Sequence, residues 1–218
     1  MAETLLAMRT RVKLRCGNKS GIDDVIDDNL NEATRQVVVE MKPQECWEDI
    51  TFSTTSGTSN YSFSTIGVST TVYAVLMVRD DTDDVEVLRG GIREYNRVRR
   101  DTDDSSNLGD PRRWTRQENS LILYSKIPDD ATRTVRMTYL ELPDEMSSDT
   151  DTFPLNEEWR LPVERLATAL TWADLNDMNK HNMNMSLFRE MLALRDRPES
   201  LEDEAPEAQL VPYIEDYG

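Results

Sequence analysis

Apolar positions recur with a helical period near the start of the chain. Leu5, Met8 and Val12 share one face of a first expected helix, and a longer apolar stripe over residues 22–41 marks a second. Ser20 precedes this second stripe at the position of a capping residue, as in a capping box. The pattern therefore predicts two helices in the first forty residues, the second of them capped by Ser20.

The helical period returns after about Trp159. Apolar residues three and four positions apart continue to Leu175, and the polar run 179–182 is expected to weaken the helix before it resumes towards Arg197. Neither pair of helices can bury its apolar stripe alone. We therefore expect the two ends of the chain to pack together as one helical bundle.

Between these ends the apolar period is two, which is typical of strands. Alternation over residues 50–54 and 61–65, on either side of a Ser- and Gly-rich stretch, predicts a hairpin or a bulged strand pair. The run 73–78 is continuously apolar, so we expect a strand that is buried on both faces. A turn at 80–84, a short helix at 92–100 and strands at 114–117, 120–124 and 132–142 complete this region.

The order of these elements predicts the α+β class. We expect a helical bundle formed by the N- and C-terminal helices (1–46 and 155–198), an inserted small antiparallel β module (47–154) and an extended C-terminal tail (199–218). The tail is acidic, contains two prolines and shows neither period, so it is not expected to fold alone. Its apolar and aromatic residues could dock on a partner: Leu210, Val211, Pro212, Tyr213, Ile214 and Tyr217.

The chain is strongly acidic, with 42 acidic and 25 basic side chains and a net charge of −17. This balance argues against a groove that grips nucleic-acid phosphates. One stretch is locally basic, and two interpretations of it stay open: contact with an acidic partner, a neighbouring subunit or passing DNA, or ion pairs with the acids between its members. These arginines are Arg93, Arg97, Arg99, Arg100, Arg112, Arg113 and Arg116.

Residues suited to catalysis or metal binding are sparse, so we expect no catalytic site, no metal site and no cofactor. The single histidine, His181, is interpreted as a polar surface or capping residue. The acidic loop after residue 100 superficially resembles a calcium loop, but Ser106 and Arg112 stand where an EF-hand needs Gly and Glu. Glu157 and Glu158 are adjacent and point to different faces, so they are poorly placed to flank a glycosidic bond.

A set of short motifs follows a fixed order along the chain. They are Trp47, Gly57-x-x-x-Tyr61, Gly109-x-Pro111-x-x-Trp114, Leu121-x-Leu123, Val135-x-Met137-x-Tyr139 and Phe153-Pro154-Leu155. None of them is specific alone. In this order they resemble the head-to-tail adaptor, or connector, proteins of short-tailed (podovirus-type) bacteriophages.

The resemblance implies a structural virion protein and not an enzyme. It implies a homo-oligomeric ring, usually a dodecamer, between the phage portal protein and the tail nozzle or tail tube proteins. Genome DNA would pass through the ring's channel during ejection without specific binding, and the C-terminal tail would reach along a portal subunit. The expected location is the phage neck in the virion and the host cytoplasm during assembly, with no membrane partner.

Two alternatives from other classes of protein remain open. The first is a tail-associated peptidoglycan hydrolase that uses acidic residues. The second is a carbohydrate- or fibre-binding tail module built on the β region. A lytic assay and a sugar-binding assay, respectively, distinguish them from an adaptor.

Overall fold

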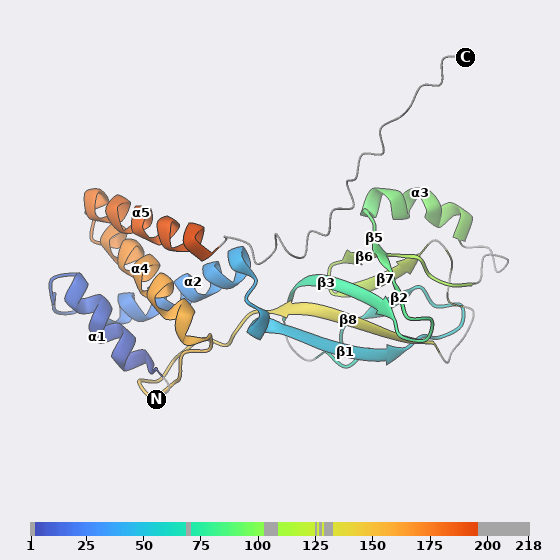
Figure 1. The fold of residues 1–218 in the computed structure, drawn as a ribbon, viewed down its shortest axis with the longest axis horizontal. Coiled ribbons are helices and arrows are strands. Elements are labelled where there is room, and N and C mark those ends of the chain that lie inside the picture. The colour runs from blue at the N-terminus through green and yellow to red at the C-terminus, as the bar shows by residue number, and fades with distance from the viewer. Residues whose placement is uncertain are drawn as a thin grey trace, which may run out of the picture.

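The structure is a computed structural model of the chain that describes residues 3–68, 71–102, 109–124, 126, 128 and 133–195, without the side chains of 98–102 and 195. These residues form five α-helices and eight strands. In Figure 1, α1, α2, α4 and α5 gather at one end of an elongated molecule, and the strands and α3 form the other end. The mixed content of helices and sheets confirms the predicted α+β class.

Helices α1 (Leu5–Arg15) and α2 (Asp23–Met41) are the two helices predicted for the start of the chain. The predicted cap of α2 is wrong. Ile22 is the N-cap residue and makes no side-chain hydrogen bond to the helix. Gly21, in the left-handed region at φ +73°, turns the chain between Ser20 and the helix, so the Ser20 hydroxyl is not the capping group.

Helices α4 (Glu157–Asp174) and α5 (Met178–Arg195) form the second pair. The interruption predicted at 179–182 lies earlier, because Asn176 adopts a left-handed conformation at φ +58°. The polar run instead forms the first turn of α5. There the Asp177 side chain accepts a hydrogen bond from the Lys180 amide at 3.2 Å, which satisfies one of the amides that a helix start leaves free.

Side chains from all four helices of this end pack in one hydrophobic cluster. Large buried side chains of this kind each stabilise a fold by roughly 1.5–3 kcal/mol before the cost of ordering them. Residues outside the helices, such as Leu140 on a strand and Phe153 in the following loop, join the same cluster. Its fully buried members include Leu5, Met8 and Val12 of α1, Ile26, Leu30 and Val37 of α2, and Val163 and Leu166 of α4.

Two four-stranded sheets form the other end. The first has the order β1 (Trp47–Ser53), β8 (Thr134–Glu141), β3 (Val72–Asp80) and β4 (Val85–Glu86). The second has the order β2 (Asn60–Ser62), β7 (Ser120–Tyr124), β6 (Arg113–Gln117) and β5 (Leu88–Arg89). The expected antiparallel module is thus two sheets, with one parallel pair, β5 and β6. Side chains of both sheets fill a single core, so the sheets pack face to face.

The hairpin predicted for residues 50–65 is wrong, because its two halves belong to different sheets. β1 pairs with β8, with Phe52 opposite Val135, and β2 pairs with β7, with Tyr61 opposite Leu121. Alternation along a strand shows which side is buried but not which strand lies beside it. Phe52 and Tyr61 still meet, across the core between the sheets, with their ring centroids 5.1 Å apart.

Strand β3 is buried less completely than its apolar sequence predicts. Val75 and Val78 face the core between the sheets, but Tyr73 and Met77 remain 41% and 40% exposed. Two register shifts against β8 turn side chains away from strict alternation. The prediction of burial on both faces is therefore wrong for this strand.

The chain crosses from the first sheet to the second directly after β3. Residues 80–84 form the predicted turn, and β4 returns along β3. The chain then passes through buried Val87 to β5, beside β6. Helix α3 (Ile92–Thr102) follows β5 and covers the second sheet (Figure 1).

Candidate functional site

The arginines singled out in the sequence gather on and beside the second sheet. Arg113 and Arg116 belong to β6, Arg112 precedes it, and Arg93 and Arg97 are exposed on α3. The side chains of Arg99 and Arg100 lie outside the described residues. The structure thus places the described members in one part of the molecule but gives them different neighbours.

Arg113 ties α3 to the sheet beneath it. Its Nη1 lies 3.1 Å from Oε2 of Glu94, and the same carboxylate oxygen accepts a hydrogen bond from the Tyr124 hydroxyl at 3.1 Å. Burial, and then the hydrogen bond to Glu94, raise the pKa of Tyr124 above its ordinary value. The ring of Tyr95 packs edge-on against Tyr124. This arginine therefore has a structural role within the chain.

Arg116 connects the two sheets. Its guanidinium donates to the carbonyl oxygens of Val72 and Tyr73 on β3 and to that of Glu118 in the turn after β6. Its charged end also lies 5.4 Å from the centre of the Phe63 ring. Burial lowers the pKa of Arg116. Among the described residues, the hydrogen-bond partners of this arginine are main-chain carbonyls.

Arg133 holds an ion cluster that was not predicted. Its guanidinium contacts carboxylates of Asp80, Asp83 and Asp110, and the Nη1–Oδ2 distance to Asp83 is 2.6 Å. The side chain is only 9% exposed. Burial opposes its charge, but the hydrogen bonds that Arg133 donates to Asp83 and Asp80 outweigh burial and raise the pKa of Arg133. The cluster joins the turn after β3, the start of β6 and the start of β8.

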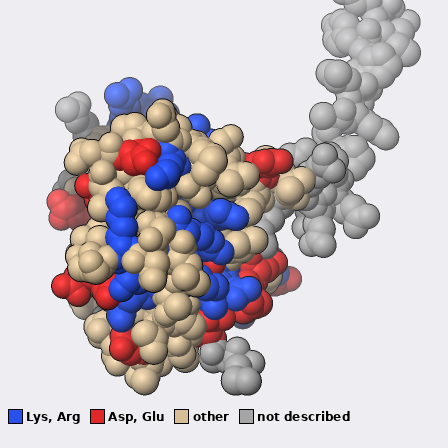
Figure 2. Space-filling view, turned by 90° about the vertical axis from the view of Figure 1, so that its left-hand side faces the viewer, with Lys and Arg blue, Asp and Glu red and all other residues tan. Residues whose placement is uncertain are grey.

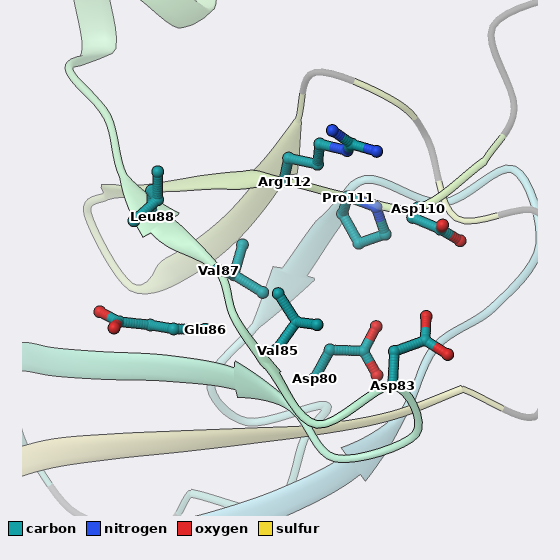
Figure 3. Close-up of a pocket in the computed structure, with 9 residues that line it drawn as sticks. All are labelled: Asp80, Asp83, Val85, Glu86, Val87, Leu88, Asp110, Pro111 and Arg112. Atoms are coloured by element: carbon teal, nitrogen blue, oxygen red, sulfur yellow. The ribbon is translucent and has the colours of Figure 1, made fainter.

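A pocket of about 370 Å³ opens beside this cluster. Figure 3 shows Asp80 and Asp83 on one side of it, Pro111 and Arg112 on another, and the segment from β4 to β5 along its length. Val85 of β4 and Leu88 of β5 are 56% and 55% exposed. The lining is therefore partly apolar and partly charged: Asp80, Asp83, Val85, Glu86, Val87, Leu88, Asp110, Pro111 and Arg112.

The acids of this pocket do not form a pair suited to acid–base chemistry. Asp80, Asp83 and Asp110 all form salt bridges with Arg133. Among the described residues, no histidine, cysteine or hydroxyl side chain lines the pocket. The arrangement can accept a side chain from another molecule, but it offers no activated nucleophile.

A second charged site lies at the helical end. Glu164 of α4 is 1% exposed and accepts hydrogen bonds of 2.6 Å from Arg11 Nε and Arg15 Nη1 of α1. Arg11 also contacts Glu3 at 2.7 Å, and Arg160 contacts Glu3 at 3.3 Å. A buried carboxylate is tolerated only when it is paired in this way. The network joins α1 to α4.

Trp172 of α4 carries two lysines on its ring. The Nζ atoms of Lys180 and Lys19 lie 3.8 Å and 4.9 Å from the ring centre, one from α5 and one from the turn after α1. The buried thiol of Cys16 lies close to the charges of both lysines and of Arg15. Burial raises the pKa of Cys16, and these positive charges only partly oppose it. The thiol is therefore protonated and unreactive near neutral pH.

The remaining candidates have structural surroundings. Nδ1 of His181 lies 2.9 Å from the carbonyl oxygen of Ala169, so the ring links α5 to α4. Glu157 forms a salt bridge with Arg160, one turn along α4. Most of the acidic loop after residue 100, including Ser106, lies outside the described residues, as do the tail positions 210–214 and 217. In the described part of the chain no group of three or more His, Cys, Asp or Glu could hold a metal ion.

None of the helices in the described ranges is both long and apolar enough to cross a membrane. A family model with the description SU10 adaptor protein matches residues 3–210, which is nearly the whole chain. The match extends over the helices of both ends and over both sheets. A search of curated proteins finds no match.

Proposed function

The chain belongs to the SU10 adaptor protein family, and from this membership we propose that it is the head-to-tail adaptor of a tailed bacteriophage. In this role it forms a ring, a dodecamer by resemblance to connector proteins, between the portal protein and the tail nozzle. The observation that carries the proposal is the match over residues 3–210, which includes all the described helices and strands. An adaptor family is structural, so the chain acts by contact and not by turnover.

The proposed units are a helical bundle (1–46 and 155–198) and an inserted β module (47–154). Two separate hydrophobic clusters support this division, although Leu140 and Phe153 of the β module pack in the cluster of the bundle. Packing of α1 and α2 against α4 supports the first unit. The bundle contacts the portal and the neighbouring subunits, and the β module points towards the tail.

The tail, residues 199–218, is proposed to lie along a portal subunit in the virion. Its anchors are the six apolar and aromatic residues named above, from Leu210 to Tyr217. Burying each large side chain would contribute roughly 1.5–3 kcal/mol before ordering costs. The exposed arginines of α3, Arg93 and Arg97, and Arg112 at the pocket remain available for a neighbouring subunit or tail protein.

The acidic balance of the chain supports a channel that DNA crosses without binding. Every copy carries a net charge of −17, so a ring concentrates negative charge near the axis. Such a wall repels phosphates. The neck of the virion is the corresponding location, reached from the host cytoplasm during assembly.

Native mass spectrometry of the chain mixed with the portal protein of the same phage tests the proposal. We expect one complex that contains a portal ring and a fixed number of chains, twelve if the resemblance extends to stoichiometry. Absence of any complex would contradict it. Release of soluble fragments from peptidoglycan by the purified chain would instead favour the hydrolase alternative.

A further inference from the structure

The helical end of this acidic protein presents a basic face. Figure 2 shows Lys and Arg gathered over the end that carries α1, α4 and α5, with Asp and Glu largely towards its edges. The nearby charges that act on Cys16 and on Arg165 place these cations together. We define the basic face as Arg11, Arg15, Lys19, Arg165 and Lys180.

Acids pair with three of the five cations of this face. Arg11 and Arg15 share Glu164, which is buried beneath them, Arg11 also contacts Glu3 at 2.7 Å, and Lys180 contacts Asp177 at 3.0 Å. In the described residues neither Lys19 nor Arg165 forms a salt bridge.

Arg165 is the least satisfied of these cations. Its Nε is buried without a hydrogen-bond partner in the described part of the chain, and its Nη1 makes only a 3.5 Å contact with Asn184. Burial, and next the charge of Arg15, lower the pKa of Arg165. A bound anion would compensate the positive charge of Arg165.

Trp172 positions the two lysines before any partner arrives. Both ammonium groups lie over its ring and are attracted to its π-electrons. Lys19 and Lys180 are exposed, so a partner can reach them. Holding two cations at a fixed separation lowers the entropy that binding must remove.

Several acids of the other acidic clusters already have partners within their own chain. Asp80 and Asp83 face Arg133, Asp81 faces Arg136, and Asp84 faces Arg79. At the start of α2, Asp23 pairs with Lys13, and Asp27 pairs with Arg9. By contrast, residues 199–207 contain Glu199, Glu202, Asp203, Glu204 and Glu207 and no basic residue.

The first acids of this segment cannot easily reach the basic face of their own copy. The segment follows α5 at Arg195, whereas Lys180 is fifteen residues earlier on the helix, about 22 Å away at 1.5 Å per residue. An extended chain covers at most about 3.3 Å per residue, so Glu199 reaches roughly 13 Å and Glu202 roughly 23 Å. Glu204 and Glu207, with roughly 30 and 40 Å of chain, can reach either their own Lys180 or that of a neighbouring copy.

A closed ring needs a contact of this kind. Its subunits meet through two different, complementary surfaces, and identical acidic chains otherwise repel one another. We propose that the basic face of one copy binds the acidic segment 199–207 of the adjacent copy. The contact sets the order of subunits and leaves residues 210–217 free for the portal. This inference rests on the proposed ring function.

Zero-length cross-linking of the full chain tests the contact directly. Unlabelled and ¹⁵N-labelled copies are mixed at low ionic strength, and a carbodiimide joins carboxylates to lysines in contact. We expect cross-links from residues 199–207 to Lys19 and Lys180 between copies of different isotope, and fewer of them as salt rises. Cross-links only within one copy, or no preference over the exposed Lys42 and Lys126, would overturn the inference.

Charge reversal provides a second readout. The variant Lys19→Glu/Lys180→Glu should lose association between copies at low salt, and adding Glu202→Lys/Glu204→Lys should restore it. The control Lys42→Glu/Lys126→Glu makes the same change in net charge and should behave as the wild type. If a short DNA duplex protects Lys19 and Lys180 from acylation while the tail acids stay unlinked, the face binds nucleic acid and the inference is wrong. Because free copies are used, a failure here leaves the portal complex as a separate test.

Discussion

Arg11 of α1 donates its Nε to a carboxylate oxygen of Glu164 on α4 across 2.6 Å, which joins two helices whose residues are 153 positions apart. Arg15 binds the other oxygen of the same carboxylate. Glu164 is almost completely buried, and both of its carboxylate oxygens are paired with arginines. Helix α1, near the start of the chain, and helix α4, after the β strands, are thus held together by one ion cluster as well as by apolar packing.

The substitution Glu164→Gln should destabilise the protein markedly. Two arginines would lose their shared anion, and a broken buried ion pair costs about 3 kcal/mol at the lower end of the known range. Denaturant unfolding followed by circular dichroism measures the change. Glu157→Gln, which affects an exposed pair with Arg160, is the matched control and should cost less than about 1 kcal/mol. Equal effects of the two substitutions would contradict this role of Glu164.

The sequence predicted the helices well because the 3.6-residue period reports burial directly. Strand partners were not predictable, since Phe52 and Tyr61 show the same alternation whether they lie in one sheet or in two. Tertiary contacts determine the pairing: the strands of Phe52 and Tyr61 each pair with a strand more than fifty positions away.

The partners of the candidate site residues were not predictable from the sequence either. The density of arginines before β6 did not indicate that Arg116 binds carbonyl oxygens on another sheet. The position of Arg133 could have been predicted in part. It lies two and four positions before the buried Val135 and Met137, so strand alternation turns it to the same, inward face. An inward arginine needs anions, but nothing local identified Asp80, 53 positions earlier.

Glu3 should contribute stability that acid removes. Burial alone would raise the pKa of Glu3, but the hydrogen bond and charge of Arg11 and the charge of Arg160 outweigh it and hold the pKa below its ordinary value of 4.5. A lowered carboxyl pKa stabilises the folded state above the unfolded value, and this contribution is lost as the pH falls through the folded pKa. The free energy of unfolding of the wild type should therefore fall more steeply below about pH 4.5 than that of Glu3→Gln. Parallel curves for the two proteins would show that Glu3 has no such coupling.

Replacement of Arg133 by methionine should lower the stability of the β region by about 3–5 kcal/mol, since buried Asp80 would lose its counter-charge. Arg136→Met is the control. Arg136 pairs with Asp81 nearer the surface, and its loss should cost below about 1 kcal/mol. Tryptophan fluorescence during urea unfolding, to which Trp114 of this region contributes, measures the midpoint. A midpoint unchanged in Arg133→Met would contradict the role of the ion cluster.

Gly90→Ala should disturb the attachment of α3. A Cβ at this position would lie 1.6 Å from the Tyr124 hydroxyl oxygen, whereas a Cβ at Gly91 meets nothing within 4 Å. Forcing an extra carbon into a packed site costs about 1–3 kcal/mol. Gly91→Ala should leave stability unchanged or raise it by up to about 1 kcal/mol. Thermal unfolding of both variants measures the difference. Equal melting temperatures would show that the Tyr124 side chain moves aside without a measurable loss of stability.

The central claim is that the chain forms a ring beneath the portal, and particle images of the chain mixed with its portal protein test this most directly. Class averages by electron microscopy should show a second ring below the portal, coaxial with it and absent when the chain is omitted. The ring should have a central opening that continues the portal channel. Portal particles without added density, or with the chain bound singly at the periphery, would contradict the account.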